Sequence, residues 1–224
     1  WEVLEGIVKH ETEYDVADAS DFDPELRGTL EAQITNIADE MAYTAHDLDD
    51  GLRSGMINAG MLSGMPLWEV LVESIHWKGV ELDEMPRHRL IRRLIGMAVT
   101  DIISHTDENI RKSGAGSVLE LQQLDHNVVG FSEEDRYRTR ELKDFLYKKL
   151  YRHHRVVRMA VKAERIVTDL FNAYVGEQTM LPPHIQAWIE DRGLERAVCD
   201  YIAGMTDRYA IDEHRKLFDP QTLP

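Results

Sequence analysis

Three aspartates and one tyrosine recur at helical spacing within residues 28–52. At about 100° per residue, they fall together on one side of a helix: Asp39, Tyr43, Asp47 and Asp50. Asp is a poorer helix-interior residue than Glu, and Tyr43 is a large ring between two carboxylates, which weakens the explanation of a solvated face. A carboxylate that binds a divalent metal, next to a ring that packs a sugar, would account for this pattern. A solvated charged face stays open as the alternative.

A second group of residues suits an anionic ligand. Between Arg136 and Arg165 there are eleven Lys and Arg residues and three acids, in a chain whose formal net charge is −15. Lys143, Tyr147, Tyr151 and His154 follow one another at steps of four, four and three, so one helix face presents a cation, two rings and an imidazole. Such a face could hold the phosphates and base of a nucleotide. A solvated amphipathic helix with partly exposed tyrosines explains the spacing equally well.

The elements that must position these residues are predicted to be helices. Apolar residues recur at three- and four-residue steps almost throughout, and strict alternation is hard to find, which indicates an all-α fold. On residues 28–52 the predicted buried stripe is Leu30, Ile34, Ile37, Met41, Leu48 and Leu52. The predicted helices cover about 1–10, 25–53, 66–78, 86–112, 132–153, 154–175, 183–191 and 194–210. Because no linker or repeat is evident, we expect residues 1–224 to form a single domain.

The bulk properties exclude several classes of protein. A net charge of −15 disfavours duplex DNA as a partner, because the surface as a whole repels a polyanion. No apolar run is long enough to span a membrane and no basic-then-apolar segment occurs near Trp1, so we expect neither a membrane span nor a secretion signal. The single cysteine, Cys199, cannot form an internal disulfide, so we expect a cytoplasmic protein. Since the chain opens on Trp1 with helical spacing already established, we also expect it to be a fragment.

The segment from Ile37 to Leu52 resembles the part of the dGTPase-like deoxynucleoside triphosphate triphosphohydrolases that supplies the last aspartate of the HD-superfamily metal site. The likeness extends through nearly the whole chain. It implies an HD-domain-like phosphohydrolase fold without its N-terminal HD helices, the chain being the C-terminal portion. By the same likeness, Asp39 ligates the metal, Tyr43 lies against the substrate, and Asp47 accepts a hydrogen bond from the deoxyribose 3′-hydroxyl.

The segment from Glu141 to Val156 resembles the same family. The resemblance places Lys143 at a position that reaches the triphosphate and Tyr151 against sugar or base. Arg152, His153 and His154 lie where base and phosphate neighbours are found, and Tyr147 completes the expected substrate-binding set. It implies hydrolysis of a dNTP to a deoxynucleoside and triphosphate with a divalent ion, Mg²⁺ or Mn²⁺. It also implies a deoxynucleoside triphosphate as ligand and a homo-oligomer.

Most of the metal ligands of such an enzyme are missing from this sequence. The family's first three ligands, a histidine and a His-Asp dyad, come from helices earlier in its chain. The adjacent pair His46-Asp47 does not replace the dyad, because neighbouring helix residues point about 100° apart. Asp101 and His105 stand four residues apart and are expected to form a surface pair. We therefore predict no catalytic residue in this chain and one metal ligand, Asp39. A non-catalytic helical module for nucleotide binding or oligomerisation is the alternative.

Overall fold

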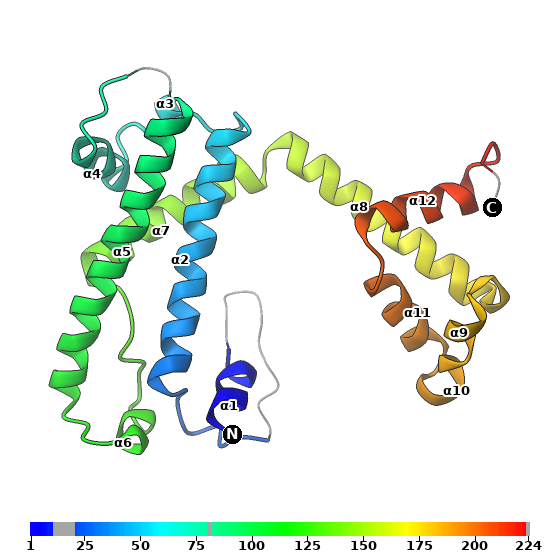
Figure 1. The fold of residues 1–224 in the computed structure, drawn as a ribbon, viewed down its shortest axis with the longest axis horizontal. Helices are drawn as coiled ribbons and strands as arrows, with labels where there is room; N and C mark the ends of the chain where they lie inside the picture. The colour runs from blue at the N-terminus through cyan, green and yellow to red at the C-terminus, as the bar shows by residue number, and fades with distance from the viewer. Residues whose placement is uncertain (11–20, 80–81, 223–224) are drawn as a thin grey trace. The chain divides into compact units, whose positions relative to one another are not determined.

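The computed structural model describes residues 1–10, 21–79 and 82–222, and within them every regular element is a helix (Figure 1). This confirms the predicted all-α fold. By internal contacts the chain divides into two compact units, Trp1–His153 and His154–Pro224. The boundary falls inside the basic segment 136–165, where neither Gly nor Pro indicates a linker. The assignment of all residues to one domain stays a prediction.

Three long helices form the scaffold of the first unit. They are α2 (Leu30–Arg53), α5 (Glu84–Ser113) and α7 (Glu133–Leu146), and α7 continues directly into a π-helical turn, η1 (Tyr147–Tyr151). Helix α2 packs against both α5 and α7. The shorter helices of this unit are α1 (Glu2–Val8), α3 (Ala59–Leu62), α4 (Pro66–Ser74) and α6 (Val118–Gln122).

Two hydroxyl side chains fix where the site-bearing helices begin. The Thr29 hydroxyl accepts a hydrogen bond from the Ala32 amide, and the Ser132 hydroxyl accepts one from the Asp135 amide. Each cap satisfies an amide that has no partner within its own helix. Helix α2 therefore starts at Leu30, whereas the apolar spacing predicted a start near residue 25.

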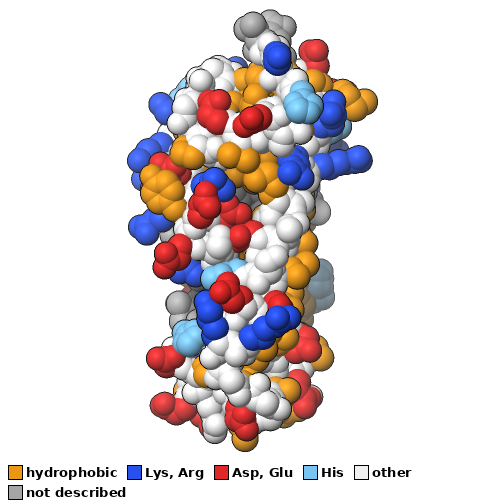
Figure 2. Space-filling view, turned by 90° about the vertical axis from the view of Figure 1, so that its left-hand side faces the viewer, with side chains coloured by type: hydrophobic (Ala, Val, Ile, Leu, Met, Phe, Trp, Pro, Cys, Tyr) orange, Lys and Arg blue, Asp and Glu red, His pale blue; other side chains and the backbone are white. Residues whose placement is uncertain are grey.

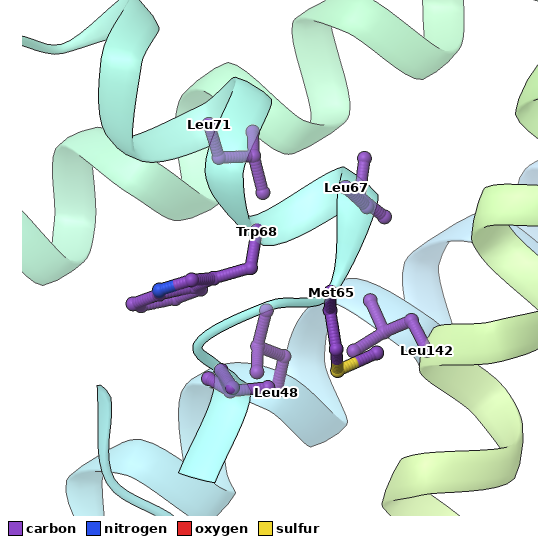
Figure 3. A pocket seen from close by; sticks show the side chains of 7 residues that line it. Leu48, Met65, Leu67, Trp68, Leu71 and Leu142 are labelled. Atoms are coloured by element: carbon purple, nitrogen blue, oxygen red, sulfur yellow. The ribbon is translucent and has the colours of Figure 1, made fainter. Parts of the chain in front are cut away.

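The main core of the first unit lies between α2, α4, α5 and α7. Leu48, Leu90, Leu142 and Leu146 are among its buried members. Figure 3 shows a small gap in this core beside Leu48, Met65 and Leu142, with a volume of about 10 Å³. A gap of this size, lined only by apolar side chains, is too small and too dry to hold a ligand.

The predicted apolar stripe of α2 is confirmed at most of its positions. Leu48 is buried in the main core with Leu52 against it, while Leu30, Ile37 and Met41 pack on a second cluster around Ala98, Ile102 and Val128. The prediction is wrong for Ile34, which is 45% exposed. The buried positions in that part of α2 are Ala32 and Gln33. Gln33 is held there because its side-chain oxygen accepts hydrogen bonds from the Val128 and Val129 amides.

The second unit consists of α8 (His154–Gly176), η2 (Gln178–Met180), α9 (Pro183–Gln186), α10 (Trp188–Arg192), α11 (Leu194–Ala203) and α12 (Asp207–Phe218). Its core gathers Leu170, Tyr174, Leu181, Ile185 and Val198. The hydroxyl of Tyr174 donates a hydrogen bond to Glu213 Oε1 at 2.8 Å, which ties α8 to α12. Burial and this carboxylate both raise the pKa of Tyr174.

The predicted helix 194–210 is in fact two helices. It breaks at residues 204–206, because the Thr206 hydroxyl accepts from the Tyr209 amide and begins α12, which then continues to Phe218. The segment 183–191 is likewise divided at Ala187 into α9 and α10. In both cases the apolar spacing continues across a short break, so periodicity alone does not reveal it.

The surface carries charges of both signs. In Figure 2, acidic, basic and apolar side chains are interspersed over the face that is turned to the viewer, and no broad basic area covers that face. None of the described helices combines the length and the apolar character that a membrane crossing requires.

Candidate functional site

The three aspartates and the tyrosine singled out on α2 form an acidic stripe: Asp39, Tyr43, Asp47 and Asp50. This stripe lies on the side of the helix away from the buried residues Thr44, Ala45 and Leu48. Tyr43 is 63% exposed, and Asp39 and Asp47 are partly exposed. The placement follows from helical geometry, because residues three or four apart share a face. The structure thus brings Asp39, Tyr43 and Asp47 together on one accessible face.

The residues predicted to face an anionic ligand on α7 and η1 form a basic stripe: Lys143, Tyr147 and Tyr151. Leu142, Leu146 and Leu150 are buried at steps of four, while Lys143, Tyr147 and Tyr151, each one residue later, are half-buried or exposed. In η1 the Arg152 amide donates to the Tyr147 carbonyl, five residues back. A π turn is wider than an α turn, which keeps residues four apart closer to one line along the helix. The turn therefore holds Tyr151 on the same side as Lys143.

Two side-chain contacts join helix α2 to the α7–η1 segment. Lys143 Nζ lies 3.2 Å from Glu40 Oε1, and the Tyr151 hydroxyl donates to Asp47 Oδ2 at 2.5 Å. From the first contact to the second, the residue number rises by seven in α2, from Glu40 to Asp47. It also rises by eight in α7–η1, from Lys143 to Tyr151, so the two segments run parallel here. Residues more than 100 positions apart in sequence thereby form one surface.

The remaining predicted residues differ in their placement. The guanidinium of Arg152 lies 5.5 Å from the centre of the Tyr147 ring, in a cation–π contact that occupies one side of that ring. His153 closes the first unit and is half-buried. His154 begins α8 and belongs to the second unit, so the structure does not place it relative to Asp39 or Lys143.

Asp39 has a neighbour that the sequence did not reveal. His10 Nε2 lies 3.7 Å from Asp39 Oδ2, and the two side chains are 32% and 34% exposed. The other ring nitrogen, Nδ1, lies 2.5 Å from Asn36 Oδ1. His10 follows α1 and stands 29 positions before Asp39 in the sequence, so no helical spacing could connect the two residues.

Glu40 is a second residue missed by the sequence reasoning, although its position one residue after Asp39 offered a signal. It supplies the acidic partner of Lys143. Asp49 is a third, and it pairs with the buried Arg87 of α5. This ion pair lies between α2 and α5 and fixes the helix that carries the acidic stripe.

The described side chains do not complete a metal site. Nowhere in residues 1–10, 21–79 and 82–222 do three or more His, Cys, Asp or Glu side chains gather as metal ligands. Asp101 has a structural contact, since its Oδ2 accepts a hydrogen bond from the Ser132 amide at the start of α7. One carboxylate with one nearby imidazole is too small a donor set for a firmly held divalent ion.

Comparison with known proteins gives the class first. Residues 129–216, which include α7, η1 and most of the second unit, match the phosphohydrolase-associated domain. The chain is also 46% identical over 98% of its length to a deoxyguanosinetriphosphate triphosphohydrolase-like protein of Geobacter sulfurreducens. Proteins of the same description from Ralstonia nicotianae and Deinococcus deserti are each 41% identical, over 100% and 86% of the chain.

The chain is thus similar over most or all of its length to these dGTPase-like proteins, which confirms the resemblance found in the two segments. It covers 58%, 58% and 50% of the lengths of these three relatives. The chain therefore spans little more than half of the proteins that it matches.

Proposed function

We propose that this chain is part of a metal-dependent hydrolase that cuts a deoxynucleoside triphosphate into a deoxynucleoside and triphosphate. In this proposal Asp39 is one ligand of a divalent ion, Mg²⁺ or Mn²⁺. The nucleotide-binding wall consists of Tyr43, Asp47, Lys143, Tyr147, Tyr151, His153 and His154. The complete enzyme is cytoplasmic and homo-oligomeric, and its other metal ligands lie outside this chain.

The observation that carries the proposal is the parallel placement of α2 beside α7–η1. It sets the ammonium group of Lys143 beside Glu40, next to Asp39, and it sets the Tyr151 ring beside Asp47 further along the same surface. Each of these groups has a counterpart on a nucleotide, because sugars pack on rings, hydroxyls donate to carboxylates and phosphates bind cations. The dGTPase-like descriptions of the relatives support the same substrate class.

The contacts between the stripes suit ligand exchange. Lys143 and Glu40 are 34% and 41% exposed, and an ion pair of such exposure contributes at most about 1 kcal/mol. A phosphate oxygen can therefore compete with Glu40 for the ammonium group. Asp47 accepts from Tyr151 through Oδ2, and a carboxylate has a second oxygen that can accept from a sugar hydroxyl.

A non-catalytic helical module is the second candidate. It is favoured by the lack of a three-ligand group among the described residues and by the exposed apolar side chains on the first half of α8, among them Met159 and Val161. Such a module would bind a nucleotide or a second copy without cutting anything.

Product analysis separates the two candidates. The full-length protein, given dGTP and Mn²⁺, should release deoxyguanosine and inorganic triphosphate, which ³¹P NMR distinguishes from diphosphate and monophosphate. The 224-residue chain alone should release no triphosphate, because one ligand does not hold a catalytic metal. Binding of dGTP without any cleavage by the full-length protein would support the module, and triphosphate release by the chain alone would contradict the assignment of a single ligand.

A further inference from the structure

The imidazole of His10 spans one turn of α2. Its Nδ1 meets Asn36 Oδ1 at 2.5 Å, and its Nε2 faces Asp39 Oδ2 at 3.7 Å. Asn36 and Asp39 are three residues apart and therefore lie on the same face of the helix. Because the Asn36 carbonyl oxygen can only accept, Nδ1 carries the hydrogen and donates it. This contact sets the plane of the ring and directs Nε2 towards Asp39.

The backbone that carries His10 is fixed against α2. A β-carbon on Gly6 would lie 3.3 Å from the Ala32 β-carbon, so α1 packs closely on α2 at this point. Lys9, the residue before His10, donates three hydrogen bonds, to Glu5 Oε1 and to the carbonyls of Asp23 and Leu26, at 2.8–2.9 Å. Glu5 itself is only 1% exposed. His10 thus follows an anchored lysine and has little freedom to move away.

Asp39 has no comparable restraint from its own helix. A helical aspartate can adopt two χ1 rotamers, and only one orientation of its carboxylate suits a given ligand. The distance of 3.7 Å between Nε2 and Asp39 Oδ2 is longer than a direct hydrogen bond, so the ring acts on the carboxylate through one bridging water, which donates a hydrogen bond to Nε2 and another to Oδ2. This bridge favours the rotamer that faces the ring.

We propose that His10, held by Asn36, is a positioning residue that selects the rotamer of Asp39. The inference rests on the proposed function in one respect, because that function makes Asp39 a metal ligand. Partners that orient a ligating side chain typically change metal affinity or activity by 10–100-fold when they are removed. His10 adds no ligand in this proposal, and its effect passes entirely through the Asp39 carboxylate.

The first test uses the 224-residue chain without metal. Three-bond couplings report the χ1 distribution of Asp39 by NMR. We expect one dominant rotamer in the wild type and averaged couplings in His10→Phe, which keeps a flat ring without its nitrogens. Asn36→Leu, which removes only the anchor of the ring, should have the same effect and serves if His10→Phe fails to fold. His126→Phe is the control, because it removes an exposed histidine paired with Asp125 elsewhere. Wild-type couplings in both His10→Phe and Asn36→Leu would overturn the proposal.

The second test measures Mn²⁺ binding by full-length protein without substrate. His10→Phe should raise the dissociation constant for Mn²⁺ about 10- to 100-fold while leaving the thermal unfolding temperature of the metal-free protein unchanged. Loss of affinity in Asp39→Asn with wild-type affinity in His10→Phe would overturn the role of His10 and leave the proposed function intact. Wild-type affinity in Asp39→Asn would instead contradict the proposed metal site, and the rotamer measurement would still decide whether His10 positions Asp39.

Discussion

The Tyr151 hydroxyl donates a hydrogen bond to Asp47 Oδ2, so a residue of the π turn η1 fixes a carboxylate of α2 that lies 104 positions earlier. The same carboxylate is the proposed acceptor for the substrate 3′-hydroxyl. Tyr151 therefore both orients Asp47 and lines the surface where a sugar would lie. The contact joins the two helices into one surface.

This relationship leads to a prediction about the sugar. In full-length protein, Asp47→Ala should lose most of the discrimination between a dNTP and its 2′,3′-dideoxy analogue. A hydrogen bond to a charged acceptor is worth roughly 1.5–3 kcal/mol, or about ten- to a hundredfold in kcat/KM, and the variant has no such bond to lose. Glu31→Ala, which removes an exposed acid from the first turn of the same helix, is the control and should keep the wild-type ratio. A wild-type ratio in Asp47→Ala would place the 3′-hydroxyl elsewhere.

The ion pair behind the site should contribute to stability. Arg87→Met leaves Asp49 without its cation and should lower the free energy of unfolding by about 3 kcal/mol, because the remaining carboxylate is largely desolvated. Arg111→Met breaks an exposed pair with Asp107 and should change it by less than about 0.5 kcal/mol. Urea unfolding measures both variants. Equal effects would show that Arg87 has no special role in holding α2 to α5.

Gly51, within the segment that carried the family resemblance, leaves room for a buried side chain. A β-carbon there would lie 2.6 Å from Ile57 Cδ1 and 3.2 Å from its Cγ1, and Ile57 is only 1% exposed. Gly51→Ala should therefore destabilise the chain by about 1–3 kcal/mol despite its better helix propensity. At Gly96 of α5 nothing lies within 4 Å of such a carbon, so Gly96→Ala should stabilise by about 0.5–1 kcal/mol. Thermal unfolding of both variants distinguishes steric from propensity effects.

Tyr174 predicts a pH dependence for the second unit. Its pKa is raised above the usual value of about 10, so its contribution to stability is complete below pH ~10 and declines as the pH rises towards the raised pKa. Tyr174→Phe removes the hydrogen bond to Glu213 and should cost about 1.5–3 kcal/mol at pH 8. The difference between wild type and variant should shrink by pH 11. A difference that stayed constant would mean that the phenol ionises equally in folded and unfolded chains.

Much of this architecture follows from local sequence. The helical class, the long helices and the faces of α2 and α7 all follow from residues three and four apart, which is the range that periodicity describes. Ile34 shows the limit of this reasoning, because Gln33 is buried in its place through hydrogen bonds to residues 128 and 129. Long-range polar contacts of this kind leave no trace in the spacing of apolar residues.

The site was only partly predictable for the same reason. The resemblance indicated Asp39, Asp47, Lys143 and Tyr151 one by one, but their pairing depends on two helices that meet in space. Glu40 and His10 were missed because their contacts are distant in sequence. Glu40 pairs with Lys143, 103 positions away, and His10 faces Asp39, 29 positions away. The break at residues 204–206 was also missed, because a capping Thr in an apolar pattern looks like an ordinary helical position.

The central claim is that α2 and α7–η1 form one nucleotide site, and binding of a non-hydrolysable dGTP analogue to full-length protein tests it most directly. A change on either helix should raise the dissociation constant about tenfold, which corresponds to the loss of one good contact. The two variants are Tyr43→Ala on α2 and Lys143→Met on α7. Glu31→Ala on α2 and Lys149→Met on η1 should leave the dissociation constant within twofold of the wild-type value. If the controls weakened binding as much as Tyr43→Ala and Lys143→Met, or if only one helix mattered, the account would be contradicted.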